Sequence, residues 1–217
     1  MRLARGLGRA LPSRPARSRT PKNKRASVSW ESGESESVNL MRRTTLAQIR
    51  VSIRPGRRSQ GLLFAGPLAF RVALGRSGIK ADKREGDGGT PRGLFHPVRL
   101  WWRADRLPRP STLLPVRRIG RDDAWCEDPR DRRYNRSFRR SANEPGDRLR
   151  RDDRLYDMIV EIDHNRRPRI AGRGSAVFVH VARPGFGPTA GCVALRSNDL
   201  RKLLARLSTK SRILVQC

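Results

Sequence analysis

The chain has 217 residues, enough for one domain with a tail, and its 49 Lys and Arg against 20 Asp and Glu give a formal net charge of +29. Hydrophobic residues make up only 36% of the chain, so the core must be modest and confined to part of it. No apolar run approaches the ~18 residues of a membrane-spanning helix, and no apolar stretch follows the basic N-terminus, so we expect no secretory signal peptide of the usual form.

The positive charge has two interpretations. Proteins this basic often bind nucleic acid, a membrane surface or an acidic polymer. A general preference for Arg explains the charge equally well, because 43 of the 49 basic residues are Arg and they are spread along the chain. A basic nucleic-acid-binding protein stays open as an alternative function. No nucleic-acid partner is expected, however, because aromatic residues are only 6% and no recognition motif is present.

In chain order, residues 1–42 are rich in Arg, Ser and Pro and low in aromatics. They are predicted to form a disordered basic extension, because they bury too little apolar surface to offset chain entropy. The predicted folded domain covers residues 43–217. Its first strand is indicated by Ile49, Val51 and Ile53, which alternate with polar residues.

Two apolar runs, Gly61–Ala65 and Leu68–Leu74, flank a Gly-Pro break and predict a β-hairpin. Leu94–Trp102 is predicted to be another strand. Residues 103–154 are rich in Arg, Asp and Pro and weakly periodic. A segment this long without clear elements is predicted to be an insertion or lid.

The insertion contains scattered aromatic residues, among them Trp125 and Tyr134. They fit a lid over a site, and they fit ordinary packing beneath a loop equally well. Beyond the insertion, Leu155–Ile162 is predicted to be a strand.

Val177–Val181 is predicted to be a further strand. Its alternation places the three valines on one face, and Phe178 and His180 on the other. The valines can then line the core while His180 faces a cleft.

A helix is predicted near the C-terminus. Ser197-Asn198-Asp199 is typical of an N-cap, and a stripe of leucines at helical spacing follows it. Arg212–Val215 is predicted to be a short closing strand. The predicted fold class is therefore mainly β with one helix in the C-terminal region.

The chain has three cysteines, Cys126, Cys192 and Cys217, without CxxC spacing, and only three histidines. A zinc site is not expected from this set, and we predict neither a metal nor a cofactor. An odd number of cysteines leaves at least one thiol free. A Cys126–Cys217 disulfide would leave Cys192, and the sequence does not decide whether that pair forms.

Cys192 is the main candidate for chemistry. It follows Gly191, lies twelve residues after His180, and ends a loop rich in Gly and Pro. A thiol downstream of a histidine held by a strand is typical of a nucleophile with its general base. A buried structural cysteine is the alternative. The glycine-rich approach favours catalysis, since the N–H groups of Gly191 and Cys192 can form an oxyanion hole.

Two blocks of the sequence carry a family resemblance. Gly174–Arg183 together with Gly187–Leu195 resembles the catalytic segment of L,D-transpeptidase domains of the YkuD type. Upstream, Gly89–Phe95 resembles the Thr-Pro-x-Gly segment of that family, and the order and distance of the blocks also match. The resemblance extends over roughly residues 46–215.

The resemblance implies a β-sandwich-like fold with a cleft beneath a lid. It also implies that Cys192 is the nucleophile, that His180 is the general base and acid, and that Thr189 is the Ser or Thr before the Gly-Cys pair. Two positions depart from the family pattern. Ala190 stands where the family usually has His, and Ala194 stands where it commonly has Arg, although Arg196 is near.

The activity implied by the resemblance is cysteine acyl transfer on peptidoglycan stem peptides, which cross-links the cell wall. Hydrolysis of the same substrate, as in an L,D-carboxypeptidase, is the alternative. Gly191, Thr189 and Arg183 are the predicted substrate-binding or oxyanion residues, with Arg183 holding a substrate carboxylate. The substrate implies the cell envelope or periplasm, although without a clear signal peptide a cytoplasmic location stays open. The oligomeric state also stays open.

Overall fold

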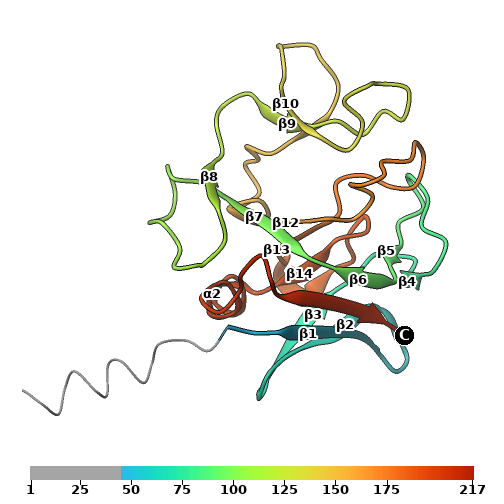
Figure 1. Ribbon diagram of the computed structural model, residues 1–217, viewed down its shortest axis with the longest axis vertical. Helices are drawn as coiled ribbons and strands as arrows, with labels where there is room; N and C mark the ends of the chain where they lie inside the picture. Colours follow the sequence, from blue (N-terminus) through green and yellow to red (C-terminus); the bar gives the residue numbers. More distant parts are fainter. Residues whose placement is uncertain (1–44) are drawn as a thin grey trace, which may run out of the picture. The chain divides into compact units, whose positions relative to one another are not determined.

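The structure is a computed structural model that describes residues 45–217 (Figure 1). The prediction of a disordered extension at residues 1–42 lies outside the described residues. The described part is mainly β with one α-helix, as predicted. Its elements are β1 (Gln48–Arg54), β2 (Arg57–Ala65), β3 (Leu68–Ala73), β4 (Ile79–Lys80), β5 (Thr90–Pro91), β6 (Gly93–Phe95), β7 (Pro97–Trp102), β8 (Val116–Arg118), β9 (Asp123–Trp125), β10 (Ser137–Arg139), β11 (Asp147–Arg148), β12 (Met158–Ile162), β13 (Phe178–Val181), the 3-10 helix η1 (Pro184–Phe186), β14 (Val193–Leu195), α2 (Ser197–Leu204) and β15 (Arg212–Gln216).

The largest sheet has ten strands in the order β6-β15-β1-β2-β3-β14-β13-β12-β7-β8. The predicted hairpin is confirmed, because β2 and β3 pair antiparallel around Gly66-Pro67. The pairs β1 with β15, β13 with β14 and β7 with β8 are parallel. The pairing of β13 with β14 therefore joins the predicted histidine strand to the segment after Cys192.

The main core packs between the two halves of this sheet and α2. Ile49 and Val72 come from the first half, and Val160 and Val179 from the second. The helix adds its leucine stripe, which is fully buried at Leu200. The strand alternation predicted for Val177–Val181 is confirmed, since Val177 and Val179 belong to this core and Phe178 to a different one.

The second core lies on the other face of β7, β12 and β13. There Trp101, Ile159 and Phe178 of the sheet pack with Trp125 and Tyr156. The insertion at residues 103–154 thus packs onto the sheet and carries strands of its own, with β10, β9 and β11 forming a three-stranded sheet. None of β8–β11 is longer than three residues, and strands this short show no recognisable alternation of apolar and polar residues in the sequence. The lid role of the insertion stays a prediction.

Two predicted strands are shorter than expected. The run at 94–102 splits at His96, whose N–H donates to Asp163 Oδ1, so that β6 pairs with β15 while β7 pairs with β12. Pro97 has no N–H to continue a ladder, and the chain changes position in the sheet there. The run at 155–162 becomes a strand only at Met158, because Leu155–Asp157 belongs to a turn that Asp157 N–H closes on Arg154 O.

The predicted N-cap is also wrong in detail. Ser197 is already the first residue of α2, and Arg196 holds the N-cap position without a side-chain hydrogen bond. Asp199 lies in the first turn, where a negative charge interacts favourably with the helix dipole. The three cysteines are all free, so Cys126 and Cys217 do not pair in this structure.

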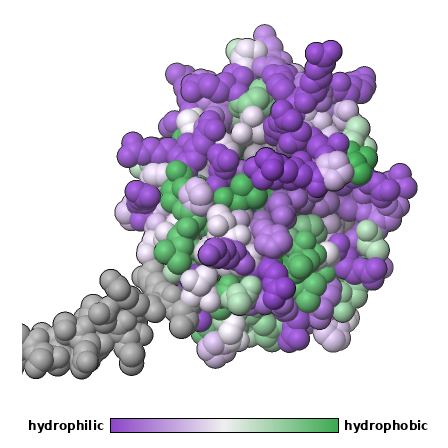
Figure 2. Space-filling model, viewed as in Figure 1, coloured by the Kyte–Doolittle hydropathy of each residue, from purple (hydrophilic) through white to green (hydrophobic). Residues whose placement is uncertain are grey.

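Polar and charged side chains cover much of the surface near the insertion on the face seen in Figure 2. Many arginines there bind a nearby aspartate, as in the pairs Arg103–Asp105 at 2.7 Å and Arg151–Asp153 at 2.6 Å. Part of the positive charge of residues 45–217 is therefore balanced locally.

The buried leucine stripe of α2 gives a prediction for stability. We expect Leu200→Ala to lower the free energy of unfolding by about 2–5 kcal/mol, because it leaves a cavity between the helix and the sheet. Leu94→Ala is the control, since Leu94 is 48% exposed on β6 and its loss should cost at most about 0.5 kcal/mol. Urea unfolding measures both, and equal effects would contradict the assigned core.

Candidate active site

The parallel pairing of β13 with β14 brings His180 and Cys192 to one face. Val179 pairs with Val193 and His180 with Ala194, while Cys192 directly precedes β14. Side chains alternate along a strand, so Cys192 shares the face of Phe178 and His180, opposite the valines. Both residues line one cavity of about 280 Å³.

The Cys192 thiol is held by backbone groups at the start of β13. Its Sγ donates a hydrogen bond to Ala176 O at 3.2 Å and accepts one from Phe178 N–H at 3.4 Å. The residue is only 6% exposed, and burial raises the pKa of the thiol to about 12. The described residues include no hydrogen bond from Cys192 to His180, so the thiol proton rests on a carbonyl in this state.

His180 is oriented by its own strand. Its Nδ1 lies 2.9 Å from Val181 O, which fixes a proton on Nδ1 and leaves Nε2 as the acceptor nitrogen. Burial lowers the pKa of His180 to about 4, although the bond to Val181 opposes that shift. At neutral pH the pair is therefore a neutral imidazole and a neutral thiol.

The loop before the thiol requires glycine at position 191. Gly191 has φ +149°, and a Cβ built there would lie 2.9 Å from Gly89 O. Thr189 organises the same turn, since its Oγ1 donates to Cys192 O at 2.7 Å and accepts from Gly191 N–H at 3.1 Å. Gly191 N–H thus already has a partner, and its predicted oxyanion role requires Thr189 to release it.

The two blocks of the family resemblance meet at this loop. Thr90 is buried, and its Oγ1 accepts from Gly75 N–H at 2.8 Å. Gly75 forms a parallel bridge with Thr189 on the thiol loop. The Thr-Pro-x-Gly segment is therefore linked through Gly75 to the loop that carries Cys192.

Charges of both signs line the cavity. The basic lining residues are Arg76, Lys83, Arg151 and the exposed Arg183. The substrate-binding role of Arg183 stays a prediction. The acidic lining residues are Glu85, Glu127 and Asp147. Desolvation, followed by repulsion from Asp147 and Glu85, raises the pKa of Glu127 to about 7.

A tyrosine that the sequence did not single out packs against His180. The Tyr156 ring meets the His180 ring edge to face, with centroids 5.3 Å apart. Its hydroxyl donates to Asp147 Oδ2 at 2.7 Å, and Arg151 lies 5.0 Å from the ring centroid. Tyr156 stood at the start of an expected strand, and its contact with His180 depends on a turn that no periodicity indicates.

Trp125 and Tyr134, the two aromatic residues noted in the insertion, anchor it through ring packing and hydrogen bonds. Trp125 meets Phe178 edge to face, with centroids 5.0 Å apart. Tyr134 donates to Glu85 Oε2 at 2.5 Å and accepts from Gly174 N–H at 3.0 Å. They fix the insertion beside the cavity, which is the packing alternative left open by the sequence.

Burial of His180 predicts a specific pH dependence of stability. In the unfolded chain a histidine titrates near ~6.5, whereas the pKa of folded His180 is about 4. As the pH falls from 6.5 towards 4, the unfolded state gains a proton that the folded state does not, so stability decreases. The full effect is about 3 kcal/mol.

The variant His180→Gln isolates this effect. Between pH 7 and pH 4.5 the wild type should lose about 2–3 kcal/mol more unfolding free energy than the variant, because all other titrating groups are shared. Chemical denaturation at the two pH values measures the difference. Parallel losses in both proteins would contradict a buried, neutral His180.

Comparison with known proteins shows the family of this chain. The YkuD family, described as the L,D-transpeptidase catalytic domain, matches residues 57–215. A search of curated proteins found no match. Among solved structures, L,D-transpeptidase 3 from Mycobacterium tuberculosis is similar with a TM-score of 0.40 and 14% identity, over 78% of this chain and 60% of that protein. Since the family matches well over half of the chain, the protein belongs to the YkuD family of L,D-transpeptidase catalytic domains.

Proposed function

We propose that this protein is a cysteine acyltransferase that acts on peptidoglycan stem peptides as an L,D-transpeptidase. The observation that carries the proposal is the common face of Cys192 and His180 above one cavity. The family supports the same chemistry. No metal or cofactor is required, because a thiol and an imidazole suffice for acyl transfer.

The first step acylates the enzyme. Cys192 Sγ turns from Ala176 O towards Nε2 of His180, which takes the thiol proton as general base. The thiolate attacks the carbonyl carbon at the L-centre of the third residue of the stem. The bond to D-Ala breaks, the leaving amine takes the proton back from His180, and a thioester remains on Cys192.

The second step resolves the thioester. An amine from a neighbouring stem gives its proton to His180, attacks the thioester carbonyl and forms the cross-link, and the Cys192 thiolate leaves and is reprotonated. Water in place of the amine gives the hydrolytic product of an L,D-carboxypeptidase. Incubation with a disaccharide-tetrapeptide separates the two, because transfer yields a cross-linked dimer and hydrolysis yields only the tripeptide.

The charges of the cavity support a peptide substrate that carries both carboxylates and amines. Arg183 can hold a stem carboxylate through paired hydrogen bonds. Glu127 and Asp147 can hold the ammonium group of a diamino acid. The oxyanion of the tetrahedral intermediate would rest on Cys192 N–H, and on Gly191 N–H once Thr189 releases it.

We also propose the cell envelope as the site of action, since peptidoglycan lies outside the cytoplasmic membrane. Within residues 45–217, no helix has the length and apolar character needed to span a bilayer.

The proposal predicts acylation of one thiol. A carbapenem added to the full-length protein should give a single covalent adduct at Cys192, because its strained ring carbonyl accepts the thiolate as the stem carbonyl does. Intact-mass spectrometry with peptide mapping detects the adduct and its position.

Two cysteine variants control this measurement. Cys192→Ala should give no adduct, whereas Cys126→Ala should react like the wild type, because Cys126 is a buried free thiol outside the cavity. If the wild type stays unmodified under conditions that acylate a related L,D-transpeptidase, the proposal is contradicted. An adduct that still forms on Cys192→Ala would also contradict it.

Tyr156 provides a test of how the base is positioned. We expect Tyr156→Leu to slow acylation about 10²-fold, because His180 loses the ring that fixes its orientation. Tyr156→Phe keeps the ring and loses only the bond to Asp147, so its acylation rate should fall much less. Stopped-flow acylation rates at saturating carbapenem measure both, and equal losses would assign the effect to the hydroxyl.

A further inference from the structure

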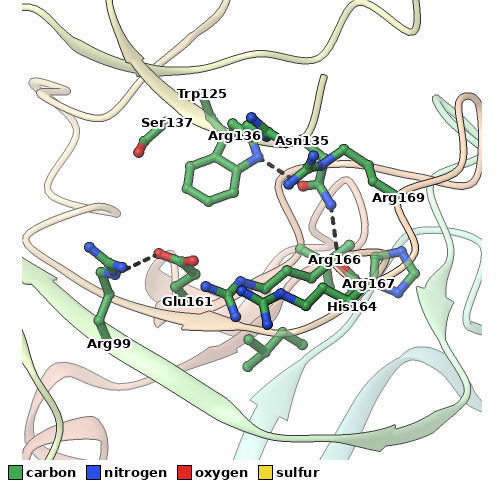
Figure 3. Close-up of a pocket in the computed structure, with 12 residues that line it drawn as sticks. Arg99, Trp125, Asn135, Arg136, Ser137, Glu161, His164, Arg166, Arg167 and Arg169 are labelled. Atoms are coloured by element: carbon green, nitrogen blue, oxygen red, sulfur yellow. Dashed lines mark hydrogen bonds and ion pairs between the residues drawn. The ribbon is translucent and has the colours of Figure 1, made fainter. Parts of the chain in front are cut away.

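A second cavity, of about 390 Å³, lies between the insertion and the turn that follows β12. Five arginines and the Trp125 side chain line this cavity, which we call the arginine pocket (Figure 3). Val177 is the one residue that lines both this pocket and the Cys192 cavity. The charged and aromatic lining residues are Arg99, Arg136, Arg166, Arg167, Arg169, Glu161, His164 and Trp125.

The charges of the arginine pocket are not balanced. Its only carboxylate, Glu161, lies 3.3 Å from Arg99 Nε and also accepts from Trp101 Nε1 at 3.0 Å. Burial lowers the pKa of His164, so its imidazole is mainly neutral at neutral pH and does not change the charge balance of the pocket. The remaining guanidiniums, which have no ion-pair partner within residues 45–217, are Arg136, Arg166, Arg167 and Arg169.

Arginines without an ion-pair partner also occur elsewhere in residues 45–217, for example Arg54, Arg92 and Arg118, so the distinguishing feature here is that four of them line one cavity. Other arginines of the insertion bind aspartates two residues away, as in Arg103–Asp105 and Arg133–Asp131. A general preference for Arg in the sequence predicts scattered arginines on the surface. It does not predict four unpaired guanidiniums around one hollow.

Arg169 is the pocket arginine whose hydrogen-bonding capacity is least satisfied. Its Nε is shielded from solvent and has no hydrogen-bond partner within the described chain. Burial, followed by repulsion from Arg136 and Arg166, lowers the pKa of this guanidinium. An anion in the pocket would satisfy the donor and offset the repulsion between the three side chains.

The frame of the pocket is fixed before any ligand binds. Trp125 Nε1 donates to Asn135 Oδ1 at 2.9 Å, and Asn135 Nδ2 donates to His164 O at 3.0 Å and Asn165 O at 2.9 Å. One amide thus joins the insertion to the turn after β12. A fixed frame lowers the entropy lost when a ligand binds.

The guanidiniums approach the hollow from two sides. Figure 3 shows Arg166 and Arg167 on one side, and Arg136 and Arg169 beside Trp125 and Asn135 on the other. A planar carboxylate offers acceptors in one plane. A phosphoryl group offers oxygens in several directions and up to two negative charges, which suits donors on opposite walls.

We propose that the arginine pocket binds a phosphoryl group, as a small phosphate, pyrophosphate or phosphate ester. Arg166 and Arg169 are the residues expected to contribute most, since both are partly buried and lie on opposite walls. The volume is that of a small-molecule site. The site is independent of Cys192 and of the proposed acyl transfer.

The test is calorimetric titration of the full-length protein with pyrophosphate at low ionic strength. We expect saturable one-to-one binding, weakened about 10–100-fold in Arg166→Gln/Arg169→Gln, because two charge-assisted contacts are lost. Arg54→Gln/Arg57→Gln removes the same charge from the exposed β1–β2 turn and should bind as the wild type does. Equal weakening in both double variants would overturn the proposal, since only general surface charge would then attract the anion.

Thermal unfolding without ligand gives a second readout. Arg166→Gln/Arg169→Gln should unfold at the wild-type temperature or above it, because mutual repulsion is removed. If that variant does not fold, Arg136→Gln replaces it, since Arg136 is exposed and its loss should also weaken binding.

Two further outcomes would overturn the assignment. Glutarate binding more tightly than pyrophosphate would assign the pocket to carboxylates. Loss of pyrophosphate binding in Arg183→Gln, with Arg166→Gln/Arg169→Gln unaffected, would place the anion in the Cys192 cavity.

Discussion

The parallel pairing of β13 with β14 is the constraint on which the site depends. The register of Val179 with Val193 places the valines of both strands in the main core. Because side chains alternate, the same register sends His180 and Cys192 to the opposite face. A shift of β13 by one residue would turn the His180 imidazole towards the valine core and away from the Cys192 thiol. Stability of the core and geometry of the site are therefore enforced by the same hydrogen-bond ladder.

Burial determines the protonation of that pair, since it keeps both the thiol and the imidazole neutral. Trp125 and Leu149 of the insertion belong to the same buried cluster as Cys192. Tyr156 and Asp147 then position the imidazole from that side. A thiol that stays protonated until substrate displaces its bond to Ala176 is protected from unwanted reaction, because the thiolate is the reactive form.

Arginine has two uses in this molecule. In much of the insertion it binds neighbouring aspartates and closes local turns, as Arg151 does with Asp153. In the arginine pocket four guanidiniums lack such partners. Other arginines without ion pairs are spread over residues 45–217, and the pocket is the place where several of them line one cavity.

The sequence by itself determined the elements with strong local patterns. The alternation around Val179, the leucine stripe of α2 and the Gly-Pro turn of the first hairpin all report burial or turn chemistry that neighbouring residues share. The Gly191-Cys192 pair and His180 could also be singled out from the sequence, because their neighbouring residues indicate a glycine-rich loop and a strand. Only the tertiary structure decided that Tyr156 packs on His180, that Gly191 N–H is already bound to Thr189 Oγ1, and that the strand at 94–102 divides at His96. These depend on contacts between segments far apart in the chain, which leave no period in the sequence. The arginine pocket is the extreme case, because its arginines come from three separate segments and only folding shows which of them lack an ion-pair partner.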